Sequence, residues 1–159
     1  MANHILMPVY QTLYGETFDY GDFEKRMKMQ KAVYLLQEMG VPMGEYGFRW
    51  YLHGPYSQEL QDDMYEEHHR SHENGRVLSD YQKELGLLHK ALTEDRHAAY
   101  SDTEWAECMG SMHYLRKHNL SSKAAKEIVT GKLKECKEHL NNDAANEAAF
   151  DVLEALFRV

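Results

Sequence analysis

The sequence predicts a mainly α-helical fold of five to seven helices with one small β element, a strand or hairpin at about residues 47–53. Apolar residues recur at helical i, i+3, i+4, i+7 spacing through most of the 159 residues. One short aromatic segment instead alternates with period two, which is typical of a strand. No repeat or linker interrupts the chain, so we expect a single domain over residues 1–159.

Two helices are expected before the β element. The first spans about residues 5–14 and has Pro8 in its first turn, where a proline is tolerated. The second spans residues 23–39, with Asp22 as its N-cap. Its apolar positions share one helical face: Met29, Ala32, Val33 and Leu36.

The predicted strand covers residues 48–53 and has two different faces. One face is apolar and is expected to join the core: Phe48, Trp50 and Leu52. The other face is polar and aromatic: Arg49, Tyr51 and His53. A turn over residues 54–57 ends the strand, and Ser57 can cap a helix that runs to about residue 69.

The pattern after residue 75 is helical throughout. Two capping boxes predict helix starts, Ser79 with Gln82 and Ser101 with Glu104. A basic helix is expected from about residue 122 to 140, and a final helix from about 143 to 157. The half of the chain beyond the strand is therefore predicted to be all helix.

A partner-binding surface is one interpretation of the strand and the turn after it. Aromatic and arginine side chains dominate the energetics of protein interfaces. The candidate residues lie on the outward face: Arg49, Tyr51, His53 and Tyr56. The alternative is an ordinary solvent-exposed face, with Gly54-Pro55 only shaping the turn.

Nucleic-acid binding is an alternative function. On a continuous helix, four lysines would share one quadrant: Lys123, Lys126, Lys134 and Lys137. Such a stripe is also typical of a solvated helix or of a contact with an acidic protein. A winged-helix-like N-terminal part is a further alternative, but residues 57–67 hold five carboxylates and no Lys or Arg. DNA phosphates repel such a helix, and the net charge of the whole chain is −8.

Metal binding and catalysis have little support in the sequence. His68, His69 and His72 are close together, but the glutamate that follows the first histidine in zincins is missing. We therefore expect a polar helix end and no metal. Cys108 and Cys136 fall on apolar helical faces and are expected in the core. No catalytic set is found, and the chain is expected not to be an enzyme.

Two segments resemble a known family. They are residues 28–36, which read KMQKAVYLL, and residues 48–57, which read FRWYLHGPYS. Together they resemble the K-[LM]-Q-K-x-x-Y-[LF] helix and the W-x-Y-G-P turn of Panacea-domain proteins and the related YwgA-type proteins. The resemblance covers about residues 22–65. Family patterns have Tyr or Lys before the Gly-Pro, where this chain has His53.

The resemblance implies a mainly helical fold with a small β element. The motif positions in this chain are Met29, Gln30, Lys31, Tyr34, Trp50, Gly54 and Pro55. Panacea domains act as antitoxins that neutralise diverse toxins by direct binding, and one relative is an adaptor that delivers its toxin to a protease.

The residues and the resemblance together favour a non-enzymatic protein-binding module. We expect an antitoxin-like protein or a regulatory adaptor from a defence or phage-related locus, with a protein partner such as a toxin. No cofactor, metal or membrane is expected, and the N-terminal residues carry no export signal, which favours the cytoplasm. The alternative is a nucleic-acid-binding regulator that uses the basic helix at residues 116–137.

Overall fold

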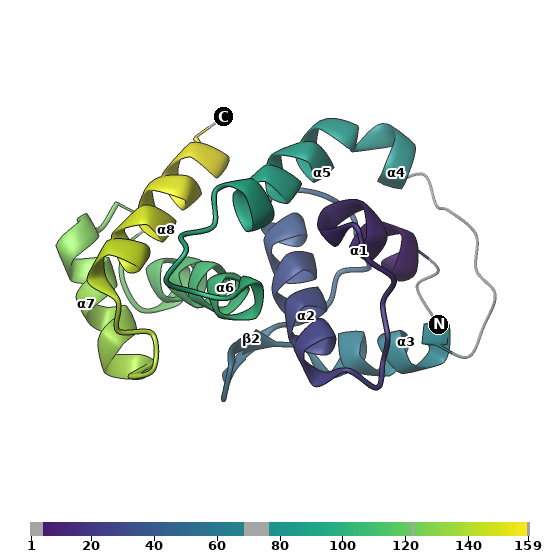
Figure 1. Ribbon diagram of the computed structural model, residues 1–159, viewed down its shortest axis with the longest axis horizontal. Coiled ribbons are helices and arrows are strands. Elements are labelled where there is room, and N and C mark those ends of the chain that lie inside the picture. Colours follow the sequence, from purple (N-terminus) through teal and green to yellow (C-terminus); the bar gives the residue numbers. More distant parts are fainter. Residues whose placement is uncertain (1–4, 69–76, 122, 159) are drawn as a thin grey trace.

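The computed structural model describes residues 5–68, 77–121 and 123–158 (Figure 1). Its helices are α1 (Leu6–Tyr14), α2 (Phe23–Glu38), α3 (Gln58–His68), α4 (Val77–Asp80), α5 (Gln82–His89), α6 (Asp102–His118), α7 (Lys126–Cys136) and α8 (Asp143–Leu156), with a π-helical turn η1 (Lys90–Glu94) after α5. Two strands, β1 (Arg49–Tyr51) and β2 (Gly54–Tyr56), form an antiparallel hairpin. The predicted mainly α fold with one small β element is confirmed.

Helix α2 lies at the centre of the structure. Ten consecutive residues, Met27–Leu36, are buried, so the helix is covered on every side and not only on its apolar face. Helix α6 packs along α2, and the α7–α8 pair covers the other side of α6 (Figure 1). Helix α2 is therefore not free to enter a DNA groove, as a winged-helix-like arrangement would require.

Side-chain caps start three of the helices as predicted. The Asp22 carboxylate accepts hydrogen bonds from two backbone N–H groups in the first turn of α2. The Ser57 hydroxyl accepts a hydrogen bond from the N–H of Leu60 in α3, at 3.2 Å. Ser101 and Glu104 form a complete capping box at α6. These local signals are strong because an uncapped helix start leaves backbone donors without partners.

The predicted capping box of Ser79 with Gln82 is wrong. Ser79 lies inside the four-residue helix α4, and α5 begins only after Tyr81. Tyr81 has no capping side chain but is packed against the hydrophobic core. Tertiary packing thus sets this helix boundary, and it divides the predicted helix into α4 and α5.

The strand prediction is wrong at its end. β1 stops at Tyr51, and Leu52 and His53 form the two-residue loop of a hairpin in which Tyr51 pairs with Gly54. The predicted turn at residues 54–57 is instead mostly strand β2. Because the alternation ends with the strand, Leu52 is 72% exposed at the hairpin tip and does not join the core.

The predicted basic helix is shorter than expected. Helix α7 spans only Lys126–Cys136, so Lys123 precedes it and Lys137 follows it in a non-helical conformation. Lys137 is buried and Cys136 is exposed, the reverse of the predicted pattern. The lysines therefore do not form one continuous stripe. Cys108 lies in the core as predicted.

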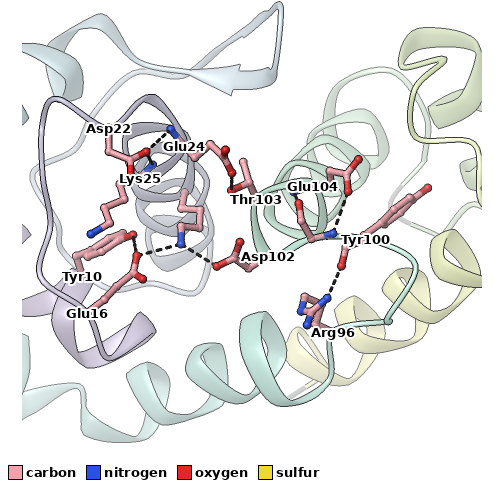
Figure 2. A network of polar contacts seen from close by, with 12 residues as sticks. Tyr10, Glu16, Asp22, Glu24, Lys25, Arg96, Tyr100, Asp102, Thr103 and Glu104 are labelled. Atoms are coloured by element: carbon pink, nitrogen blue, oxygen red, sulfur yellow. Dashed lines mark hydrogen bonds and ion pairs between the residues drawn. The ribbon is translucent and has the colours of Figure 1, made fainter.

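A buried lysine ties the N-terminal helices to α6 (Figure 2). The Lys28 Nζ atom lies 3.1 Å from a Glu16 carboxylate oxygen and 2.8 Å from one of Asp102; Figure 2 labels both carboxylates and draws the two contacts as dashed lines. It also lies 4.5 Å from the centre of the Tyr14 ring. The two carboxylates and the ring compensate an ammonium that has been removed from water.

Candidate functional site

The motif residue Gln30 joins α2 to the end of the hairpin. Its side-chain Nε2 donates a hydrogen bond to the carbonyl of Ser57, and its Oε1 accepts one from the N–H of Ser57, both at 2.9 Å. Both groups of this backbone unit are buried and would be costly to leave without partners. One amide side chain therefore fixes the chain where β2 leads into α3.

The motif residue Lys31 makes a second link from α2 to the hairpin. Its Nζ donates to the carbonyl of Pro55 at 2.9 Å, and the residue is only 1% exposed. Burial lowers the pKa of Lys31 to about 7; Glu107 opposes this shift and Lys137 adds to it. Such a low pKa means that the folded structure buries Lys31 although burial disfavours its charged form.

The third link is a close backbone contact between β2 and α6. Gly54 has φ +91°, and a Cβ there would lie 2.3 Å from the Ser111 hydroxyl oxygen. Gly110 of α6 faces both Lys31 and Pro55, with a Cβ position 3.5 Å from each side chain. Gly54 therefore lets the hairpin lie directly on α6, while a Cβ at Gly110 would make ordinary van der Waals contacts.

The hairpin tip is held from the C-terminal end of α7. The Lys137 Nζ donates to the carbonyls of Tyr51 and Leu52 and lies 3.7 Å from a carboxylate oxygen of buried Glu107. His139 contacts the same carboxylate at 3.0 Å. Burial lowers the pKa of Lys137, while Glu107 opposes the shift. Lys137, which we predicted for nucleic acid, thus has a structural role.

The remaining motif residues are also structural. Met29 lies in the core, and the Tyr34 hydroxyl is 2.9 Å from Nδ1 of His113. Trp50 packs on Tyr114, with ring centres 5.5 Å apart. The motif as a whole therefore forms the junction between α2, the hairpin and α6, and this junction orients what the hairpin exposes.

The four predicted partner-binding residues lie together on the hairpin. Arg49 and Tyr51 are exposed, and Arg49 is directly opposite Tyr56 in the strand register. The Tyr51 and Tyr56 rings are 5.4 Å apart. His53 packs its ring edge-to-face on Phe23, at 5.4 Å, and burial lowers its pKa, which favours a neutral ring.

A wider surface surrounds these four residues. We define the hairpin surface as Tyr20, Phe23, Arg26, Arg49, Tyr51, Leu52, His53, Tyr56 and Tyr65. Four large apolar side chains are at least half exposed, namely Phe23 at 50%, Tyr51 at 58%, Leu52 at 72% and Tyr65 at 52%. The Arg26 guanidinium lies over the Tyr20 ring, 5.1 Å from its centre, and Tyr65 packs against the other residues through Tyr20.

A cavity of about 240 Å³ opens on this surface between α2 and the hairpin. Its walls include Phe23, Tyr51, His53 and Tyr56, and Lys31 is the most buried of its lining residues. A second hollow, on the other side of Tyr51 and Tyr56, is lined by Arg49 and Glu59. Aromatic side chains therefore separate a cationic cavity from a hollow of mixed charge.

Five members of the hairpin surface are not predicted as partner-binding residues from the sequence: Tyr20, Phe23, Arg26, Leu52 and Tyr65. Phe23 carries a usable signal, because it is a large apolar residue in the first turn of α2, where the helix begins beyond the core. Arg26 and Leu52 carry no such signal in the sequence, since their positions on the surface depend on where the hairpin folds back.

The alternative lysine site is only partly free. Lys126 pairs with Asp151 and Lys134 with Asp143, at 2.8 and 2.9 Å, so two carboxylates of α8 compensate their charges. Lys123 is exposed at the start of the segment. With Lys137 buried, the four lysines do not form a joint phosphate-binding face.

The described part of the chain contains no group of three or more His, Cys, Asp or Glu side chains that could hold a metal ion. His69 and His72 lie outside the described residues. None of the described helices is long and apolar enough to cross a lipid bilayer. Comparison of the chain with protein-family models, curated proteins and solved structures found no match.

Replacement of Gly54 tests the close contact with α6. We expect Gly54→Ala to lower the free energy of unfolding by about 2–4 kcal/mol, because the new Cβ meets Ser111 and the backbone has positive φ. Gly86→Ala on α5 is the control, since nothing lies within 4 Å and alanine favours a helix. Urea unfolding measures both. Adding Ser111→Ala should restore part of the loss, and an unchanged stability of Gly54→Ala would contradict the contact.

Replacement of Lys31 tests its buried charge through pH. The folded pKa of about 7 lies below the ordinary 10.5, so the cost of burying the charge is full below pH 7 and shrinks as pH rises toward 10.5. The gain in unfolding free energy from Lys31→Met should therefore be larger at pH 6 than at pH 9, by on the order of 2 kcal/mol. Urea unfolding at both pH values measures it. The same gain at both pH values would refute a perturbed lysine.

Proposed function

We propose that this chain is a non-enzymatic protein-binding module, antitoxin-like or a regulatory adaptor, that binds its partner through the hairpin surface. The observation that carries the proposal is a group of half-exposed aromatic side chains, Phe23 of α2, Tyr51 of β1 and Tyr65 of α3, around a hairpin whose backbone is fixed from α2, α6 and α7. Large exposed apolar groups on a fixed frame favour binding, since little conformational entropy is lost when they are covered.

The acidic residues beside the hairpin surface support a basic partner, while the surface itself holds Arg26 and Arg49 and no carboxylate. The net charge of the chain is −8, and Glu59, Asp62 and Asp63 of α3 follow directly on the hairpin. Complementary charge speeds association and selects partners. A basic protein that acts on nucleic acid, as many toxins do, fits this exterior.

Truncation of Tyr51 tests the proposal. The protein encoded by the neighbouring gene is the partner to assay, with calorimetry as the measurement. Tyr51→Ala should weaken binding by roughly 10- to 100-fold, in the range of an interface hot spot, and leave the melting temperature nearly unchanged because the ring is 58% exposed.

The matched control is Ile128→Ala, which removes an equally exposed apolar side chain (57%) from α7. It should leave the affinity unchanged. If Tyr51→Ala and Ile128→Ala bind the partner as tightly as the parent protein, the hairpin surface is not the binding site.

A further inference from the structure

The cavity between α2 and the hairpin differs in charge from the chain as a whole. Two cations line it, Arg26 and Lys31, and its lining contains no Asp or Glu. The chain as a whole has a net charge of −8. A cavity that gathers only positive charge on an acidic protein is suited to an anionic group.

Neither cation forms an ion pair with a carboxylate of the described residues, and Glu107 acts on Lys31 only from a longer distance. Arg26 donates from Nη1 to the carbonyl of Tyr20 and lies over the rings of Tyr20 and Phe23. Lys31 donates to one carbonyl, that of Pro55, and an ammonium has three N–H donors. Both groups are held in place and have donors left for an oxygen anion.

The walls and the size of the cavity define the rest of the ligand. Phe23, Tyr51, Leu52 and Tyr56 are apolar or aromatic, so a large apolar group is favoured beside the anion. The volume of about 240 Å³ is below the roughly 300–1,000 Å³ of sites for drug-sized molecules. One amino-acid residue with a large side chain matches this size.

We infer that this cavity binds the C-terminal residue of a protein partner, with its α-carboxylate on Arg26 and Lys31 and a large apolar side chain against Phe23 and Tyr56. The inference rests on the proposed function, since it assigns part of the same surface. A C-terminal residue is the one position of a polypeptide that offers a large apolar side chain and a carboxylate together. An internal Asp or Glu offers the carboxylate with only a short apolar stem.

The probe is N-acetylphenylalanine, which presents an aromatic side chain beside a free carboxylate. Its neutral counterpart, N-acetylphenylalaninamide, is the control. Amide chemical shifts of the ¹⁵N-labelled protein at pH 6.5 should report binding of the acid with a Kd in the millimolar range, as expected for so small a ligand. The shifts should centre on Phe23, Tyr51 and His53, and the amide should bind at least 10-fold more weakly.

Two variants test whether Arg26 and Lys31 bind the carboxylate, and a third variant is the control. Arg26→Gln and Lys31→Met should each weaken binding of the acid by about 10-fold, because each removes a charge-assisted hydrogen bond. Lys83→Gln is the control, because Lys83 is exposed on α5 and does not line this cavity, so binding of the acid should be unchanged. Retained cross-peak dispersion shows that each variant is folded.

Three outcomes would overturn the inference. The first is the absence of shifts at these residues when the acid concentration is about 20 times a Kd of 1 mM. The second is equal binding of the acid and the amide. The third is tighter binding of N-acetylglutamate methylamide than of N-acetylphenylalanine. In each case, a loss of partner binding in Tyr51→Ala would still support the proposed function. Specific binding of the acid, with full partner binding by Tyr51→Ala, would instead contradict the proposed function alone.

Discussion

Buried polar groups must find partners, and in this protein that requirement joins the central helix to the hairpin. Helix α2 places an amide and an ammonium in the interior, on Gln30 and Lys31. Both donate hydrogen bonds to backbone carbonyls at the end of the hairpin, those of Ser57 and Pro55. The same bonds satisfy a backbone segment that is itself buried, so helix and hairpin depend on each other.

This mutual dependence explains how so small a β element can present a surface of fixed shape. Two three-residue strands are not stable alone in water. Here α2 and α6 fix one end of the hairpin, and Lys137 fixes the tip by binding the carbonyls of Tyr51 and Leu52. The aromatic side chains that face away from these contacts are therefore held in place, as the proposed partner binding requires. The residues that resemble a family motif provide the frame, and their neighbours provide the exposed groups.

Local signals in the sequence predict the helices and most caps, because a cap such as Asp22 acts within one turn. The outward positions of Arg49 and Tyr51 also follow from strand alternation. Leu52 does not, because the alternation ends where the chain folds back. Lys31 and Lys137 could not be predicted as buried, since their partners lie 24 and more than 80 positions away in the chain. The cavity depends on the same long-range contacts.

Native-state hydrogen exchange of the Ser57 amide tests the link between α2 and the hairpin most directly. This N–H is bonded to the Gln30 side chain and not to a backbone carbonyl. If the link holds the fold together, its exchange should be as slow as that of Val33 in the middle of α2, and both should open with the same free energy. Exchange of Ser57 near the rate of an unprotected amide, with Val33 still protected, would show that the hairpin opens independently of the core.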